Sequence, residues 1–218
     1  AAESLGAKIR NKKVGAFGES AMFSFCAPKV ITTGEGGAVV TNSKQIYEKL
    51  KLIRSHGRVE DAHYFSSAEY LDYIGLGYNF RMSNLGAALV LAQLIKIDGI
   101  IRKRRANARY LTDKLSGIKE IILPSPPEDY FQVFQMYTIR VMGGGKARDA
   151  LKNYLNKHGV MAKVYFSPIH LTAYYKSLGY QIKLPVTEQI AKEVLTLPMY
   201  PAIKKKEMDY IADSIRSF

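Results

Sequence analysis

FSFCAPKVITTGEGG, residues 23–37, is the stretch of this 218-residue chain that combines strand, turn and a candidate nucleophile. Residues 21–25 have the apolar pattern of a short strand, and residues 37–41 have another. Between them, Pro28 cannot donate to a sheet ladder, and the glycines that follow it favour a turn. We therefore expect Lys29 in a tight turn directly after a strand.

A lysine held in such a turn has the chemistry of a covalent catalyst. Its amine attacks a carbonyl when the side chain is fixed and its charge is disfavoured by desolvation or by nearby cations. The hydroxyl of Ser24, on the preceding strand, is suited to hydrogen-bond a phosphate beside the lysine. Composition alone favours the ordinary alternative, a solvent-exposed lysine, because most lysines lie on the surface.

The rest of the first half is predicted to be mostly helical. Residues 43–54 have helical periodicity, with Ser43 as the N-cap. Residues 57–82 are rich in Gly, Tyr and Ser and are typical of a long functional loop. Residues 83–116 then form the longest helical pattern. The proline-rich residues 123–129 end it and are interpreted as a linker.

The second half alternates between strand and helix patterns. Strands are expected at residues 136–142 and 160–166, and helices at residues 146–157, 186–195 and 204–216. This alternation, with helices at the end, indicates a small α/β domain.

Composition places the chain among ordinary folded proteins. It is 47% hydrophobic, and its length corresponds to one or two domains at about 150 residues each. No apolar run reaches the roughly 20 residues of a membrane helix, and no signal-peptide pattern is present. Cys26 is the single cysteine, which excludes an internal disulfide and suggests a reducing, cytoplasmic location. One cysteine and four scattered histidines also predict no metal site.

The chain is strongly basic, with 32 Lys and Arg against 19 Asp and Glu, a net charge of +13. Such a charge favours anionic partners. The densest run, residues 102–105, points in four directions on a helix, and no nucleic-acid-binding motif accompanies it. A solvated helix face therefore explains this run better than a nucleic-acid or membrane surface.

Two further segments contain residue types that are common in functional sites, but neither has the pattern that such a site requires. GGGK at residues 143–146 is not a phosphate-binding loop, because Ala147 stands where a Ser or Thr is required. His170 lies in a loop, and the residues around it favour a non-catalytic histidine.

Residues 23–37 resemble the segment that carries the cofactor lysine in the DegT/DnrJ/StrS family. These proteins are fold-type-I, pyridoxal-phosphate (PLP)-dependent aminotransferases that act on keto sugars attached to nucleotides. Other segments resemble family segments in the same order along the whole chain: AAESLGA (1–7), GAFG (15–18), RSHG (54–57), GYNFRM (77–82), YFSPIH (165–170) and LPMYP (197–201).

The resemblance implies a role for particular residues. Lys29 would be the catalytic residue, binding PLP covalently through its amine. Ser24 would bind the cofactor phosphate, and Asn79 would reach across a homodimer interface to the phosphate in the partner's site. Glu3 would lie near the cofactor. The substrate-binding residues would be His170 and Tyr165, next to the sugar nucleotide.

The resemblance also implies how the chain is organised. Residues 1–118 would complete the large, PLP-binding domain, and residues 119–218 would form the small C-terminal α/β domain. The aspartate that contacts the pyridine nitrogen would lie immediately before Ala1, so we expect this chain to be the C-terminal portion of the enzyme and inactive alone.

The expected function is transamination of a nucleotide-linked keto sugar, with glutamate as amino donor, for amino-sugar or polysaccharide biosynthesis. The expected assembly is a homodimer, without nucleic acid or membrane. The alternative is a regulatory or binding protein with the same fold and no turnover, because fold alone does not fix function.

Overall fold

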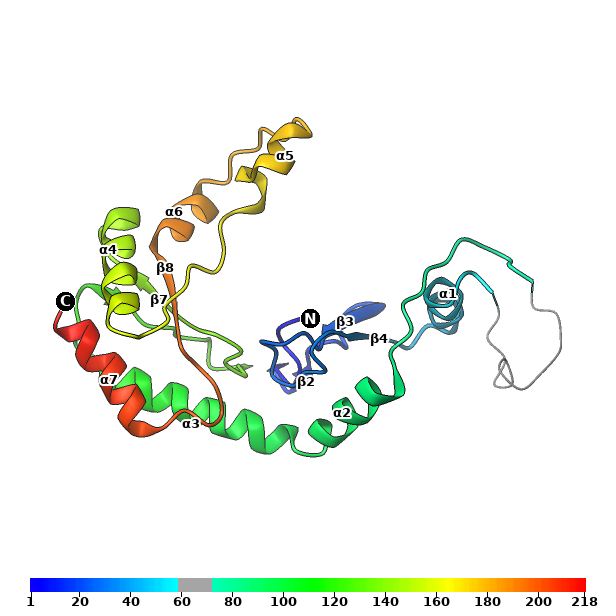
Figure 1. Ribbon diagram of the computed structural model, residues 1–218, viewed down its shortest axis with the longest axis horizontal. Helices are drawn as coiled ribbons and strands as arrows, with labels where there is room; N and C mark the ends of the chain where they lie inside the picture. The colour runs from blue at the N-terminus through cyan, green and yellow to red at the C-terminus, as the bar shows by residue number, and fades with distance from the viewer. Residues whose placement is uncertain (59–71) are drawn as a thin grey trace. The chain divides into compact units, whose positions relative to one another are not determined.

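The computed structural model describes residues 1–58 and 72–218, and its contacts group the chain into two units (Figure 1). The first unit comprises Ala1–Gly99 and Glu128–Val133. The second comprises Ile100–Pro127 and Phe134–Phe218. Each unit is described below by itself.

The described residues of the first unit form two small antiparallel sheets and two helices. Its elements are β1 (Lys8–Ile9), β2 (Lys12–Lys13), β3 (Ser20–Ser24), β4 (Gly37–Thr41), α1 (Lys44–Arg54), α2 (Asn84–Leu94) and β6 (Tyr130–Phe131). One sheet has the order β2-β1-β6, and the other pairs β3 with β4 so that Ser24 lies opposite Gly37. The strands predicted at residues 21–25 and 37–41 are thus confirmed, and they form a single antiparallel ladder.

Helix α1 begins as the sequence predicted. The Ser43 hydroxyl accepts a hydrogen bond from the backbone N–H of Ile46, which satisfies one of the free donors at the start of the helix. The expectation of one helix over residues 83–116 is wrong, because the structure has α2 and then α3 (Ile97–Leu115). Between them, Lys96 N–H donates to Gln93 rather than to the residue four positions back, so the α-helical hydrogen-bond ladder is interrupted.

Among the described residues, no individual helix has both the length and the apolar content to cross a membrane. The pair α2 and α3 meets those criteria only when the two helices are counted together across their break.

The second unit is a three-stranded antiparallel sheet with helices around it. Its elements after α3 are β5 (Ile121–Ile122), β7 (Tyr137–Val141), α4 (Gly144–Lys157), η1 (Ile169–Leu171), α5 (Ala173–Ser177), α6 (Pro185–Glu193), β8 (Val194–Leu197) and α7 (Lys205–Arg216). The strand order is β5-β7-β8.

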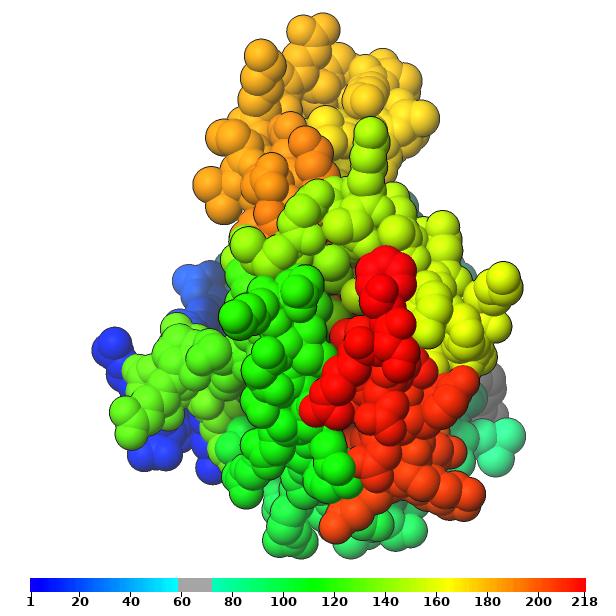
Figure 2. Space-filling model, turned by 90° about the vertical axis from the view of Figure 1, so that its left-hand side faces the viewer, coloured from blue at the N-terminus to red at the C-terminus, as the bar shows by residue number. Residues whose placement is uncertain are grey.

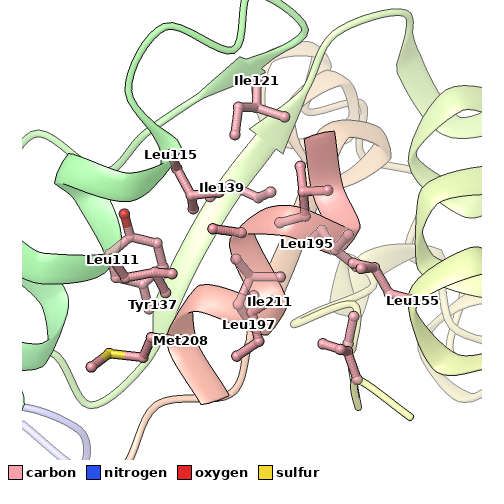
Figure 3. Close-up of a cluster of buried hydrophobic side chains, with 14 of the residues drawn as sticks. Leu111, Leu115, Ile121, Tyr137, Ile139, Leu155, Leu195, Leu197, Met208 and Ile211 are labelled. Carbon is pink, nitrogen blue, oxygen red and sulfur yellow. The ribbon is translucent and has the colours of Figure 1, made fainter. Parts of the chain in front are cut away.

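The core of the second unit is built around the central strand β7. Alternate residues of β7 are fully buried, including Tyr137 and Ile139, as expected for a strand with one face on the core. Figure 3 shows these side chains among leucines from α3, α4 and β8 and apolar residues from α7. The Tyr137 hydroxyl shares a 2.8 Å hydrogen bond with Thr112, so its polar atom is satisfied inside the core.

A buried arginine ties α3 to two distant segments of the same unit. The guanidinium of Arg104 donates to the backbone carbonyls of Phe134, Gln135 and Met199 at 3.1–3.3 Å. Burial lowers the pKa of this guanidinium from its ordinary value. The contacts group most of α3, from Ile100 onward, with the second unit. The domain bounds 1–118 and 119–218 stay a prediction.

Two other expectations for the second half need correction. Residues 160–166 form no strand; they make only an isolated bridge between Lys163 and Thr196. The helix expected over residues 186–195 ends at Glu193, and the chain continues directly as β8. From Val194 onward the backbone bonds to β7 and no longer within the helix, because Val194–Leu197 pairs with the edge of β7 that β5 leaves open.

The packing of β7, β8 and α4 predicts which substitutions destabilise the second unit. Leu155 is fully buried in this core, so Leu155→Ala should lower the free energy of unfolding by about 2–5 kcal/mol, measured by urea denaturation with far-ultraviolet circular dichroism. Val186 is 75% exposed, and Val186→Ala should change it by less than about 0.5 kcal/mol. Equal effects of the two substitutions would contradict this description of the core.

Candidate active site

The loop between β3 and β4 is closed by its own backbone. Phe25 N–H donates to Gly36 at 2.8 Å, and Thr33 N–H donates to Phe25 at 2.9 Å. Within the loop, Lys29 N–H donates to Cys26 at 3.1 Å and forms a turn. Lys29 is therefore presented from a short, hydrogen-bonded turn after a strand, as the sequence predicted.

The side chain of Lys29 is paired with Glu3. The distance from Lys29 Nζ to Glu3 Oε1 is 2.7 Å, and the two side chains are 13% and 37% exposed. A charge-assisted bond of this length fixes the position of the amine more strongly than a neutral contact would. The structure thus brings together two predicted site residues that are 26 positions apart.

Ser24 ends strand β3 on the approach to this turn. Its Oγ accepts a hydrogen bond from Cys26 N–H at 3.3 Å, which orients the hydroxyl. A hydroxyl also has a hydrogen to donate, so Ser24 can offer it to a phosphate oxygen.

Helix α2 holds the far side of the loop through Gln93. The Gln93 amide donates to the Thr32 carbonyl at 2.7 Å and accepts from Thr32 N–H at 3.1 Å. Gln93 was not among the site residues predicted from the sequence. Its signal was a single polar residue near the end of an otherwise apolar helix segment, LGAALVLAQL (residues 85–94).

The segments that contain Ser55 and Asn79 are paired with each other. His56 N–H donates to Tyr78 at 2.9 Å, and the amides of Tyr78 and Phe80 donate to the end of α1 at 2.7 and 2.9 Å. The backbones meet at Gly57 and Gly77, where a Cβ on Gly77 would lie 2.0 Å from the Gly57 nitrogen. Only glycine fits such an approach.

Asn79 is exposed and forms a polar cluster with two neighbouring side chains. Its Oδ1 accepts from Arg81 Nε at 3.2 Å, and Arg81 Nη2 lies 3.4 Å from His56 Nε2. The Asn79 amide nitrogen can still donate to an anion. His56 and Arg81 are within the quoted sequence segments, but no spacing in the sequence indicated that they would meet.

The two residues predicted to bind substrate belong to the second unit. His170 lies in η1, and its Nε2 is 3.1 Å from Glu188 Oε1. The Tyr165 ring packs edge-on against Phe166 with centroids 4.4 Å apart. Their roles, like those of Ser24, Asn79 and Glu3, stay predictions.

The side chains of the first unit suit a phosphorylated aldehyde. Lys29 provides a largely buried amine for the carbonyl, and Ser24, at the end of the strand that leads to it, provides a donor for phosphate oxygens. The partner of Lys29 is the Glu3 carboxylate and not one of the cations expected to disfavour its charge, so this contact holds the side chain in place without activating it. These groups fit PLP.

Comparison with known proteins decides the family. The model of the DegT/DnrJ/EryC1/StrS aminotransferase family matches residues 1–216. The chain belongs to this family. The resemblance found in the sequence is therefore confirmed.

Curated relatives are about one-third identical to this chain over the region that aligns. GDP-perosamine synthase of Escherichia coli O157:H7 is 33% identical over 217 residues, covering 100% of the chain and 56% of the synthase. A pleiotropic regulatory protein of Geobacillus stearothermophilus is 33% identical over 225 residues, covering 100% of the chain and 56% of that protein. The chain thus spans just over half the length of these relatives.

Solved structures confirm the predicted fold class. Helicobacter pylori PseC, an aminotransferase of pseudoaminic acid biosynthesis, has a TM-score of 0.92 at 29% identity, covering 100% of this chain and 57% of PseC. A Streptococcus pneumoniae protein solved in its PLP form has a TM-score of 0.91 at 24% identity, covering 100% and 56%, and supports the fold alone. The family assignment also confirms PLP as the expected cofactor type.

The close approach of Gly57 and Gly77 predicts a specific effect on the Asn79 segment. Gly77→Ala should disturb it and raise the exchange rate of the Tyr78 and Phe80 amides by roughly tenfold or more, measured by hydrogen exchange. Gly75→Ala is the matched control, because a Cβ there meets nothing within 4 Å. Unchanged exchange in Gly77→Ala would show that the two backbones are not held together.

Proposed function

We propose that this chain forms the lysine-bearing part of a PLP-dependent aminotransferase that aminates a keto sugar linked to a nucleoside diphosphate. The observation that carries the proposal is the Lys29–Glu3 pair in its closed loop, in a chain of this family. A second relative supports the substrate class: UDP-N-acetyl-3-dehydro-alpha-D-glucosamine 3-aminotransferase of Acidithiobacillus ferrooxidans is 32% identical and covers 99% of the chain and 55% of the relative.

The proposed roles follow from the geometry of each side chain. Lys29 Nζ holds the cofactor and then takes and returns a proton at the substrate carbon. Glu3 orients that amine, and Ser24 donates to the phosphate. The cofactor, when bound, supplies the electron sink that this chemistry needs. Glutamate is proposed as the amino donor.

Further residues are proposed to bind the cofactor phosphate and the substrate. Asn79 of a neighbouring subunit would bind the cofactor phosphate, which makes the working form a homodimer. His170 and Tyr165 would bind the sugar nucleotide. A net charge of +13 supports a dianionic substrate, because a positive field accelerates the capture of anions.

The reaction is assigned to the intact protein that contains this chain. The curated relatives extend well beyond the matched region, since the chain covers 55–56% of each of the relatives named above. We therefore expect the 218 residues alone to give no turnover. A cytoplasmic location is proposed with this function, because its substrates are phosphorylated metabolites.

One relative supports a second candidate function. The Geobacillus stearothermophilus protein is described as a pleiotropic regulator, and it matches the chain as well as the synthase does. In that case the lysine site would bind cofactor and a ligand without turnover. Formation of 2-oxoglutarate from glutamate and a keto-sugar nucleotide by the intact protein separates the two functions: steady turnover excludes the regulator, and cofactor binding without turnover supports it.

The position of Lys29 leads to a direct chemical prediction. Treatment of the PLP-loaded intact protein with borohydride should attach the pyridoxyl group to Lys29, identified by peptide mass spectrometry. Lys29→Ala should lose both the label and all turnover, because no other amine occupies that turn. Lys44→Ala, at an exposed lysine, is the control and should behave like the wild type. A pyridoxyl group found on another lysine would refute the assignment.

The proposed role of Asn79 predicts complementation between subunits. Lys29→Ala and Asn79→Ala should each impair the homodimer. When the two variants are co-expressed, heterodimers contain one site with neither defect, so activity should return to about a quarter of wild type for random pairing. Purified heterodimers without activity would place Asn79 in its own subunit's site.

A further inference from the structure

An exposed arm projects from the second unit. It begins after the bridge at Lys163 and ends at the start of helix α6. It consists of residues 165–184 and includes η1 and α5 (Figure 1). Nearly all of its side chains are exposed, among them Tyr174 at 68% and Leu178 at 55%. Figure 2 shows residues of this region standing out from the rest of the second unit. The arm therefore depends on a few specific contacts for its conformation.

His170 is an exception to this exposure. Its side chain is only 11% exposed, and Nε2 lies 3.1 Å from Glu188 Oε1 on α6. The same Glu188 oxygen accepts the backbone N–H of Leu184 at 2.9 Å, at the start of that helix. One carboxylate oxygen thus joins the beginning of the arm to its end.

The contact with Glu188 determines which nitrogen of a neutral His170 ring carries the hydrogen. The backbone bond from Leu184, and then the bond from His170, lower the pKa of Glu188, so this carboxyl is ionised at neutral pH. An ionised carboxylate only accepts hydrogen bonds, so His170 Nε2 must carry the hydrogen. In the neutral ring, Nδ1 is then the acceptor.

We propose that Glu188 is the positioning residue for His170, holding the ring in its Nε2–H form so that Nδ1 accepts a hydroxyl of the sugar nucleotide. This inference rests on the proposed function, which assigns His170 to the substrate. Nothing in the sequence indicated this pair, because Glu188 is 18 residues from His170 and belongs to a helix.

The tautomer is measured on the intact protein labelled with ¹⁵N-histidine. Long-range ¹H–¹⁵N spectra, assigned with a His170→Gln variant, should show the Nε2–H form in the wild type. The same form should persist in Glu188→Gln, whose amide oxygen still accepts the bond, and become a tautomer mixture in Glu188→Ala. A wild-type ring protonated at Nδ1, or no change in Glu188→Ala, would overturn the proposal.

Binding of UDP and of GDP, measured by calorimetry, tests the second part of the proposal, that His170 contacts the sugar nucleotide. Glu188→Ala should lower the affinity for the nucleotide that the wild type binds by about tenfold. If Glu188 acts through His170, the double variant Glu188→Ala/His170→Ala should bind like His170→Ala alone. Additive losses would show a purely structural role and overturn the proposal.

A matched control separates helix capping from positioning. Glu207 accepts the Lys204 N–H at 2.7 Å at the start of α7, as Glu188 does for Leu184, but it has no histidine partner. Glu207→Ala, which removes the acceptor as Glu188→Ala does, should leave nucleotide binding unchanged; a loss equal to that of Glu188→Ala would contradict the proposal. If the wild type binds neither nucleotide, the proposed substrate class fails, and the tautomer spectra still decide the positioning.

Discussion

The closure of the β3–β4 loop is the constraint on which the candidate site depends. Two backbone bonds at its base, from Phe25 and Thr33, and the double contact of Gln93 with Thr32 hold twelve residues of loop to a sheet and a helix at once. A lysine on a free loop would lose entropy each time it met a carbonyl. On this loop most of that loss is already incurred during folding, and Glu3 removes much of the remaining freedom of the amine.

The two units stabilise their functional groups by different means. In the second unit, a continuous apolar core around β7 supports the sheet, and the exposed arm is attached to it by specific polar contacts. In the first unit, a smaller set of buried apolar side chains, among them Phe25 and Ile31, is accompanied by hydrogen-bonded turns and by glycine contacts such as that between Gly57 and Gly77. Backbone pairing of this kind positions side chains accurately without a large buried area, which suits segments that face a ligand.

The parts of the structure that were predictable are those set by neighbouring residues. The β3 and β4 strands, the turn at Lys29 and the Ser43 cap all depend on residues within a few positions. The break between α2 and α3 was missed because apolar periodicity continues across it. β8 was missed because four residues with helical neighbours become a strand only when β7 offers them partners. Gln93 and Glu188 were missed for the same reason: their partners are 61 and 18 positions away.

The buried guanidinium of Arg104 has a consequence for the order in which the second unit is made. Its three carbonyl partners come from Phe134, Gln135 and Met199, so one of them leaves the ribosome almost a hundred residues after the arginine itself. Strand β8 and helix α7, which complete the core, also emerge last. During translation α3 therefore keeps its charged and apolar face uncovered until Met199 and the helix that follows it have been made.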